Sequence, residues 1–253
     1  MRIFLALLRR ELQAFFFSMT GYAIIAAVTF LVGVGFLVLI NSLGSEPFTE
    51  PVTAMFFNTF FFWMIVLLIA PVITMRLFAL EKASGTFETL MTTSVGDLQV
   101  VLAKFTAAAI FYLIAWLPLL ACLFIVQHFA RQTGSLDVGN VGGMYLGIFL
   151  VGCVFLSLGC LASAISNSQM FAALVSFVFG TILIAMAYAA KSTDGTLVIG
   201  HWQTRVLSQF NLFDQMHDFA RGLVDTRSVV LYVSTTLVFL FLTLRVVESR
   251  RWK

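Results

Sequence analysis

The chain has 253 residues, of which 60% are hydrophobic and only 11% are charged. Soluble domains are typically about 45–50% apolar and about 25% charged, so a water-soluble globule is excluded, and so is a disordered chain, which needs the opposite composition. The net charge is only +3, and the basic residues stand at the ends of apolar segments rather than in one patch, which excludes a nucleic-acid partner.

The first predicted element is an amphipathic helix over residues 2–17. At about 100° per residue, basic and amide side chains gather on one face and Phe and Leu side chains on the opposite face. Such a helix lies at the lipid–water interface, with its apolar face in the acyl boundary. Glu11 falls within the apolar sector: it is either a carboxylate at the rim of that stripe or the ion-pair partner of a base elsewhere, with Arg76 and Lys82 as candidates. The polar face has Arg2, Arg9, Arg10 and Gln13, and the apolar face has Phe4, Leu8, Leu12 and Phe15.

Six segments are long and apolar enough to cross the bilayer, which takes about 20 mostly apolar residues. The predicted fold is therefore an all-α integral membrane protein with six transmembrane helices, and residues 1–253 form a single membrane domain. The first segment is predicted to be a retained helix rather than a signal peptide, because it is longer than a typical signal core and follows a separate arginine-bearing helix. The predicted spans are residues 21–40, 56–74, 105–127, 143–165, 170–190 and 229–247.

The orientation follows from the distribution of Lys and Arg. With the N-terminus in the cytoplasm, ten of the 15 basic residues fall inside and five fall outside, and cytoplasmic loops are the ones enriched in basic residues. The first outer loop, residues 41–55, has Glu46 and Glu50 and no base. We therefore expect both termini on the cytoplasmic side.

The predicted spans contain no Asp, Glu, Lys, Arg or His apart from Arg245, near the end of the last one. Proton- or ion-coupled transporters and intramembrane enzymes normally need such a group at membrane depth, so both classes are disfavoured. The three cysteines have no metal-site spacing, and the chain has no phosphate-binding loop. We expect no catalytic residue, metal or cofactor in this chain, and a separate cytoplasmic subunit that hydrolyses nucleotide.

The cytoplasmic segment of residues 75–104 is the most informative part of the sequence. Ser84 and Gly85 are expected to end one helix, and Thr86 can N-cap a second helix that runs to Leu90. A short helix between two chain breaks, on the inner side of a chain without its own ATPase, is typical of a segment that enters a groove of a soluble partner.

Two stretches resemble the permease subunits of type-2 ABC exporters. One is Arg9-Arg10-Glu11 before the first span, and the other is Glu81 to Leu90, which reads E-K-x-S-G-T-x-E-x-L. The closest likeness is to the gliding-motility-associated permeases and to the permease of copper-site maturation in nitrous-oxide reductase. It covers nearly the whole chain.

The resemblance implies a type-2 exporter fold in which the 75–104 loop has the coupling helix that inserts into the ATPase. ATP and Mg are then bound by two cytoplasmic ATPase subunits, and the chain pairs with a second, identical or different, permease subunit. Relatives often have an acidic pair where this chain has Leu80-Glu81, which leaves Glu81 as the main candidate for a salt bridge to the ATPase. The implied coupling residues are Glu81, Lys82, Ser84, Gly85, Thr86, Phe87, Glu88 and Leu90, and a second cytoplasmic contact is implied at Ser166, Asn167, Ser168 and Gln169.

Small residues at four-residue spacing mark the fifth predicted span: Ala172, Ser176 and Gly180. This spacing lets helices approach closely. Packing within the chain and an interface with a second subunit both explain it, and both interpretations remain open.

Residues 191–228 are predicted to form an extracytoplasmic hairpin of one or two half-inserted helices, because they are too polar to span the bilayer. Aromatic and polar groups alternate in helical register from Arg205, and Gly222 is expected to end the helix. This arrangement resembles the extracytoplasmic hairpin of the same exporters. The residues expected on one side of the helix are Phe210, Phe213, Met216, Phe219 and Leu223.

The leading hypothesis is a non-catalytic permease subunit of an ABC transporter in the inner membrane of a bacterial cell. In it, ATP hydrolysis by the partner would drive export across the membrane or conformational work within it. The alternative is a force-transmitting or assembly scaffold, as in gliding motility, without solute flux. An extracytoplasmic partner protein is expected in that case, and the bilayer is the common environment of both.

Overall fold

The computed structural model describes residues 2–42, 52–86, 96–130, 138–193 and 211–251, and every regular element within them is a helix. Six helical stretches among these residues are long and apolar enough to cross a membrane, which confirms the six predicted apolar spans. The chain is an all-helical, multi-pass membrane protein. Its helices are α1 (Arg2–Phe16), α2 (Met19–Ser42), α3 (Val52–Asn58), α4 (Phe60–Thr74), α5 (Ala79–Ala83), α7 (Asp97–Ala115), α8 (Leu117–Ala130), α9 (Val138–Ile165), α10 (Gln169–Thr193), α12 (Leu212–Ala220) and α13 (Thr226–Arg251).

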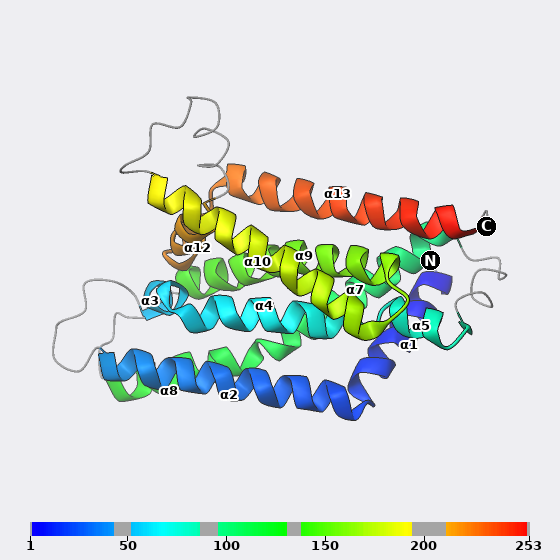
Figure 1. The fold of residues 1–253 in the computed structure, drawn as a ribbon. Coiled ribbons are helices and arrows are strands. Elements are labelled where there is room, and N and C mark those ends of the chain that lie inside the picture. Colours follow the sequence, from blue (N-terminus) through cyan, green and yellow to red (C-terminus); the bar gives the residue numbers. More distant parts are fainter. Residues whose placement is uncertain (1, 43–51, 87–95, 131–137, 194–210, 252–253) are drawn as a thin grey trace.

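The long helices run back and forth along one bundle, and both ends of the chain lie at the same end of it (Figure 1). We call this the terminal end; it has α1, α5 and the turn between α9 and α10. The opposite end has α3, α12 and the beginning of α13. Segments predicted to lie on one side of the membrane are thus grouped at one end of the bundle.

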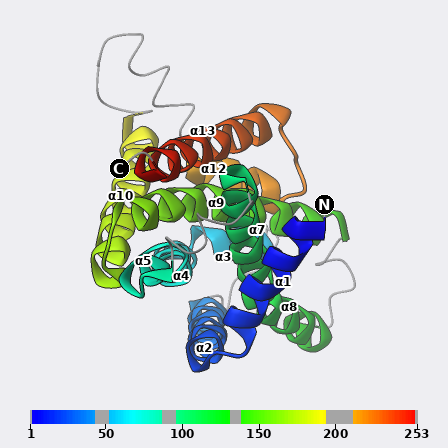
Figure 2. The same cartoon turned by 90° about the vertical axis from the view of Figure 1, so that its right-hand side faces the viewer.

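The central helix of the bundle is α9, which contacts α4, α7, α10, α12 and α13 (Figure 2). Most of its apolar side chains are buried. The close approach of α7 to α9 depends on a small residue, because a Cβ added at Gly152 of α9 would overlap the ring of Tyr112 on α7. Small residues that let backbones approach are the usual means of packing helices in a membrane. Through α9, helices from both halves of the chain are held in fixed positions.

Two predicted spans, 56–74 and 105–127, are interrupted rather than continuous. The first is broken at Thr59, whose extended backbone (φ −76°, ψ 137°) separates α3 from α4. The second is broken at Trp116, between α7 and α8. Pro118 explains the second break, because proline has no N–H to continue the hydrogen bonds of α7 but fits the first turn of a new helix.

The predicted amphipathic helix is α1, and it packs along α7. The ring of Phe15 is buried and stacks on Phe111 with 4.9 Å between the centroids. Leu8 and Leu12 are partly buried against the same core. The expectation that this face lies in the acyl boundary is corrected for these residues, because α7 covers them. Phe17, just after the helix, is 84% exposed.

Of the predicted outer hairpin, the structure describes α12 and its flanks, and Phe210 lies outside the described residues. Gly222 follows the helix at φ +78°, which confirms the predicted end. Met216 and Phe219 are buried against Gly147 of α9. Leu223 is exposed, so its predicted place on the apolar side is wrong, because it follows the glycine at which the chain leaves the helical path.

Candidate functional site

The short helix α5, which has the first of the predicted coupling residues, is docked on the end of α9. Ser163 accepts hydrogen bonds at its Oγ from the backbone amides of Phe78 and Ala79, at 3.1 Å each. Lys82 donates to the carbonyl oxygen of Ala164. Ser163 thus satisfies amides of the first turn that have no partner within α5, and α5 is joined to the helix that leads into the 166–168 turn.

The predicted break after α5 is confirmed. The helix ends at Ala83, and Gly85 has φ +73°, a conformation that is strained for any residue with a Cβ. The hydroxyls of Ser84 and Thr86 lie 2.8 Å apart, and Ser84 also donates to the carbonyl oxygen of Glu81 at 3.2 Å. The predicted helix up to Leu90, with Phe87 and Glu88, lies outside the described residues and stays a prediction.

The predicted second contact lies beside α5 at the terminal end (Figure 1). Ser166 is buried, and its hydroxyl donates to the carbonyl oxygen of Ala162 at 2.8 Å. The side chains of Asn167 and Ser168 are exposed, and Gln169 is half-buried. Of the four residues implied by the resemblance, Asn167 and Ser168 are therefore at the surface and Gln169 is partly so, next to the predicted coupling segment.

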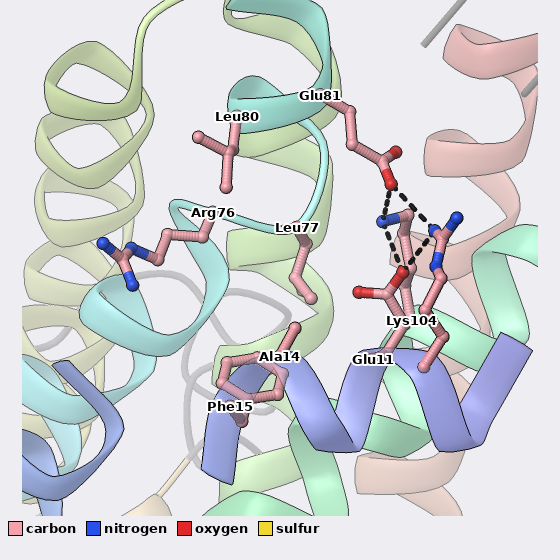
Figure 3. Close-up of a pocket in the computed structure, with 9 residues that line it drawn as sticks. Glu11, Ala14, Phe15, Arg76, Leu77, Leu80, Glu81 and Lys104 are labelled. Carbon is pink, nitrogen blue, oxygen red and sulfur yellow. Dashed lines mark hydrogen bonds and ion pairs between the residues drawn. The ribbon is translucent and has the colours of Figure 1, made fainter. Parts of the chain in front are cut away.

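A cluster of four charged residues joins α1, α5 and α7 just inside this surface (Figure 3). One oxygen of Glu11 lies 3.1 Å from Lys104 Nζ and 2.7 Å from an Arg10 nitrogen. One oxygen of Glu81 lies 2.9 Å from each of the same two bases. The cluster has two positive and two negative charges, so its formal charge is zero.

The partner of Glu11 differs from the prediction. The candidates were Arg76 and Lys82, but the structure pairs Glu11 with Lys104 and with its neighbour Arg10. Lys82 instead reaches the end of α9, and Arg76 reaches the start of α2. Because the apolar face of α1 lies on α7, the carboxylate within that face meets a base on α7 and not one on the connecting loop.

Lys104 is the residue that sequence reasoning missed. Its side chain is only 3% exposed, and its ammonium also lies 5.5 Å from the centre of the Phe78 ring. A buried ammonium is tolerated only where charges and hydrogen bonds compensate its lost hydration. A signal existed: Lys104 precedes a predicted span among small residues, Ala103 and Ala107, where a long basic side chain can lie against a second helix.

Arg10 closes the cluster from its more exposed side. Burial alone would lower the pKa of its guanidinium, but hydrogen bonding to Glu11 and the charges of Glu11 and Glu81 outweigh that effect and raise the pKa. Arg10 therefore stays charged under all ordinary conditions. Arg9, its neighbour in the predicted interfacial motif, is exposed and lies outside the cluster.

Glu81 is engaged within the chain rather than free for a partner. Its Oε1 accepts from both bases of the cluster, and its side chain is only 18% exposed. Its Oε2 is buried and has no hydrogen-bond partner within the described residues. A salt bridge from Glu81 to another subunit therefore requires that the cluster open, so Glu81 is better described as a residue that positions α5.

The small residues of α10, for which packing within the chain and a subunit interface were both open, lie against the chain's own helices. Ala172 and Ser176 are buried within the chain, and a Cβ at Gly180 would lie 2.9 Å from Leu67 and 3.2 Å from Phe155. The helices in contact with α10 include α9 and α4. The small residues of α10 thus face this bundle, and packing within the chain explains their spacing.

A pocket of about 260 Å³ adjoins the charged cluster, between α1, the connection after α4, and α7 (Figure 3). Its lining combines the four charged residues with Arg76 and four apolar side chains: Ala14, Phe15, Leu77 and Leu80. The pocket is amphipathic, and it lies next to the element whose predicted role is coupling.

Comparison with known proteins gives no assignment: no protein-family model matches the chain, and no curated protein sequence matches it.

Proposed function

We propose that this chain is the permease subunit of an ABC transporter of the type-2 exporter class. A separate cytoplasmic ATPase binds ATP and Mg, and the chain couples the hydrolysis to export across the membrane. The proposal draws on the Arg9-Arg10-Glu11 and Glu81–Leu90 motifs and on six spans without a charged relay. The permease works as a dimer, with both termini and the ATPase on the cytoplasmic side of a bacterial inner membrane.

The observation that supports this proposal best is the grouping at the terminal end. Helix α5 leads into the proposed coupling helix, and it is about 80 residues away in sequence from the 166–168 turn. The two are nevertheless neighbours in space, because Lys82 donates to the carbonyl oxygen of Ala164 and α5 contacts α10. An ATPase that binds at this end would meet both segments at once. The buried anchors of such interfaces dominate their binding energy, which assigns Phe87 and Leu90 to the groove of the ATPase.

The contacts that fix α5 in place support the proposal that movement of the ATPase groove is transmitted to the membrane helices. Ser163 ties the beginning of α5 to α9, and Glu81 ties it to α1 and α7 through Arg10 and Lys104. A displacement of the loop after Gly85 would therefore act on three helices besides α4. Packed elements transmit such displacements as units rather than absorbing them.

The test is site-specific photo-crosslinking in the intact native membrane. A photoreactive residue replaces Ser168, which is exposed at the terminal end, and in a matched variant it replaces Val224, which is exposed at the opposite end. The proposal expects a crosslink to an ATPase of the ABC class from position 168 and none from position 224. A crosslink to that ATPase from position 224 alone, or from neither position while the ATPase co-purifies with the chain, would overturn the assignment.

Reconstitution of the purified complex in liposomes separates export from the scaffold alternative. ATP-dependent solute movement supports the exporter. ATP hydrolysis that depends on an added outer partner and moves no solute supports force transmission. Hydrolysis by the single chain alone contradicts both.

A further inference from the structure

The charges that line the pocket beside α1 do not balance. Arg10, Arg76 and Lys104 supply three positive charges, and Glu11 and Glu81 supply two negative ones. Both carboxylates are bound by Arg10 and Lys104. The excess positive charge therefore belongs to Arg76.

Among the described residues, Arg76 has only hydroxyl partners. Its Nη1 lies 3.4 Å from Ser18 Oγ and also bonds to Thr20 Oγ1, while its Nε is buried and has no acceptor. A guanidinium that is partly removed from water and lacks a counter-charge is unfavourable. Its fork of donors matches the oxygens of a phosphate group better than single hydroxyls.

The position of Arg76 relative to the spans is that of the lipid headgroups. Its partners Ser18 and Thr20 flank Met19, the first residue of α2. Met19 is 92% exposed and Phe17 is 84% exposed. Large apolar side chains exposed at the very start of a membrane span lie against lipid, and arginines at span ends reach the headgroup layer.

The rest of the lining suits a lipid rather than a fully hydrated anion. Leu77 and Leu80 stand between Arg76 and the charged cluster in the view of Figure 3, and Leu80 is partly open to the outside. A phosphodiester with one negative charge and an apolar tail matches both the excess charge of Arg76 and the apolar wall formed by Leu77 and Leu80.

We propose that this pocket is a binding site for an anionic phospholipid of the phosphatidylglycerol kind. The phosphate pairs with Arg76, and the glycerol and upper acyl region lie against Leu77 and Leu80. The lipid then contacts α1 and the connection between α4 and α5, so its binding would stabilise the position of α5. This inference needs only a membrane-spanning chain and is independent of the identity of any ATPase.

The test measures lipid affinity of the full-length chain by native mass spectrometry and by the thermal midpoint in detergent, with three probes. The probes are dioleoyl phosphatidylglycerol, dioleoyl phosphatidylcholine and inorganic phosphate. We expect preferential binding of phosphatidylglycerol, and a drop of about tenfold in its affinity for Arg76→Gln, because charge-assisted hydrogen bonds of this kind are worth about an order of magnitude in affinity. Arg9→Gln removes an exposed arginine of α1 outside the pocket and should leave the affinity unchanged.

A second pair of variants leaves the charges intact. Leu80→Trp should fill part of the pocket and weaken phosphatidylglycerol binding, and Leu98→Trp, at an exposed position on the same end that does not line the pocket, should not. Stabilisation by inorganic phosphate equal to that by the lipid would assign the site to a free phosphate and overturn the lipid proposal. Equal affinities for the two lipids, or equal affinities in Arg76→Gln and Arg9→Gln, would overturn it as well.

Discussion

At the scale of single residues, Lys104 contributes most to the arrangement of the terminal end. Its ammonium lies within 3.1 Å of Glu11 and 2.9 Å of Glu81, and almost none of its side chain reaches solvent. Arg10 shares both carboxylates but is half exposed, so it can exchange protein contacts for water at little cost. The two bases of the cluster therefore differ: water can replace the contacts of Arg10 but not those of Lys104.

Removing the buried base is expected to destabilise the protein strongly. Lys104→Met leaves two carboxylates close together with one partly hydrated arginine between them, and breaking a buried ion pair in this way typically costs about 3–5 kcal/mol. The measurement is the thermal midpoint of the purified chain, with Arg9→Met as the control, because Arg9 is exposed and outside the cluster. The double variant Lys104→Met with Glu81→Gln should recover part of the loss. A midpoint for Lys104→Met equal to that of the control would show that the cluster contributes no stability.

At the scale of elements, the position of α5 is set by contacts distant in sequence. Hydropathy predicted the six spans, because burial in lipid requires long apolar runs whatever the helix neighbours are. The Ser84-Gly85 break and Gly222 were also predictable, since positive φ selects glycine locally. The docking of α5 on Ser163 was not, because nothing in a short polar segment indicates which distant hydroxyl accepts its amides.

In the candidate site, too, the contacts between residues distant in sequence are the part that could not be predicted. The stripe of Ala172, Ser176 and Gly180 shows that a helix approaches closely, but the sequence does not say whether that helix belongs to the same chain. Glu11 was recognised as exceptional because it interrupts an apolar face. Its partner Lys104 is 93 residues away, and the choice among several bases depends on the packing of α1 against α7, which averaged hydropathy does not encode.

The docking of α5 gives a prediction at this scale. Ser163→Ala removes the acceptor of two amides in the first turn of the helix, and a lost cap typically costs about 1 kcal/mol. We expect amide hydrogen exchange in residues 78–83 to become about fivefold faster, while α9 itself stays protected. Ser234→Ala is the matched control, because Ser234 is exposed and bonds only within α13. Unchanged exchange in residues 78–83 would mean that Ser163 does not hold α5 in place.

At the scale of the whole molecule, the bundle connects one end to the other through α9. The last turn of α9 is hydrogen-bonded to α5. The glycines of α9 near the opposite end pack against α12, where Gly147 lies against Phe219. A displacement at the terminal end can therefore be transmitted to the opposite end through one helix, α9, which is almost wholly buried. This geometry suits a subunit that receives work on one side of a membrane and changes shape on the other, as the proposed permease does.

The most direct test of this account is to measure the association of the chain with the proposed ATPase when the predicted coupling helix is altered. Phe87→Ala removes the proposed apolar anchor and should weaken the affinity by more than about tenfold, since such anchors are worth about 2 kcal/mol or more. Glu88→Lys should weaken it in a way that depends on salt, because charges at the rim of an interface are screened. Phe17→Ala, at an exposed apolar position of the same end, should leave it unchanged. If both loop variants co-purify with the ATPase at the stoichiometry of the unmodified chain and retain its stimulated hydrolysis, the loop after Gly85 is not the coupling element, and the central claim is contradicted.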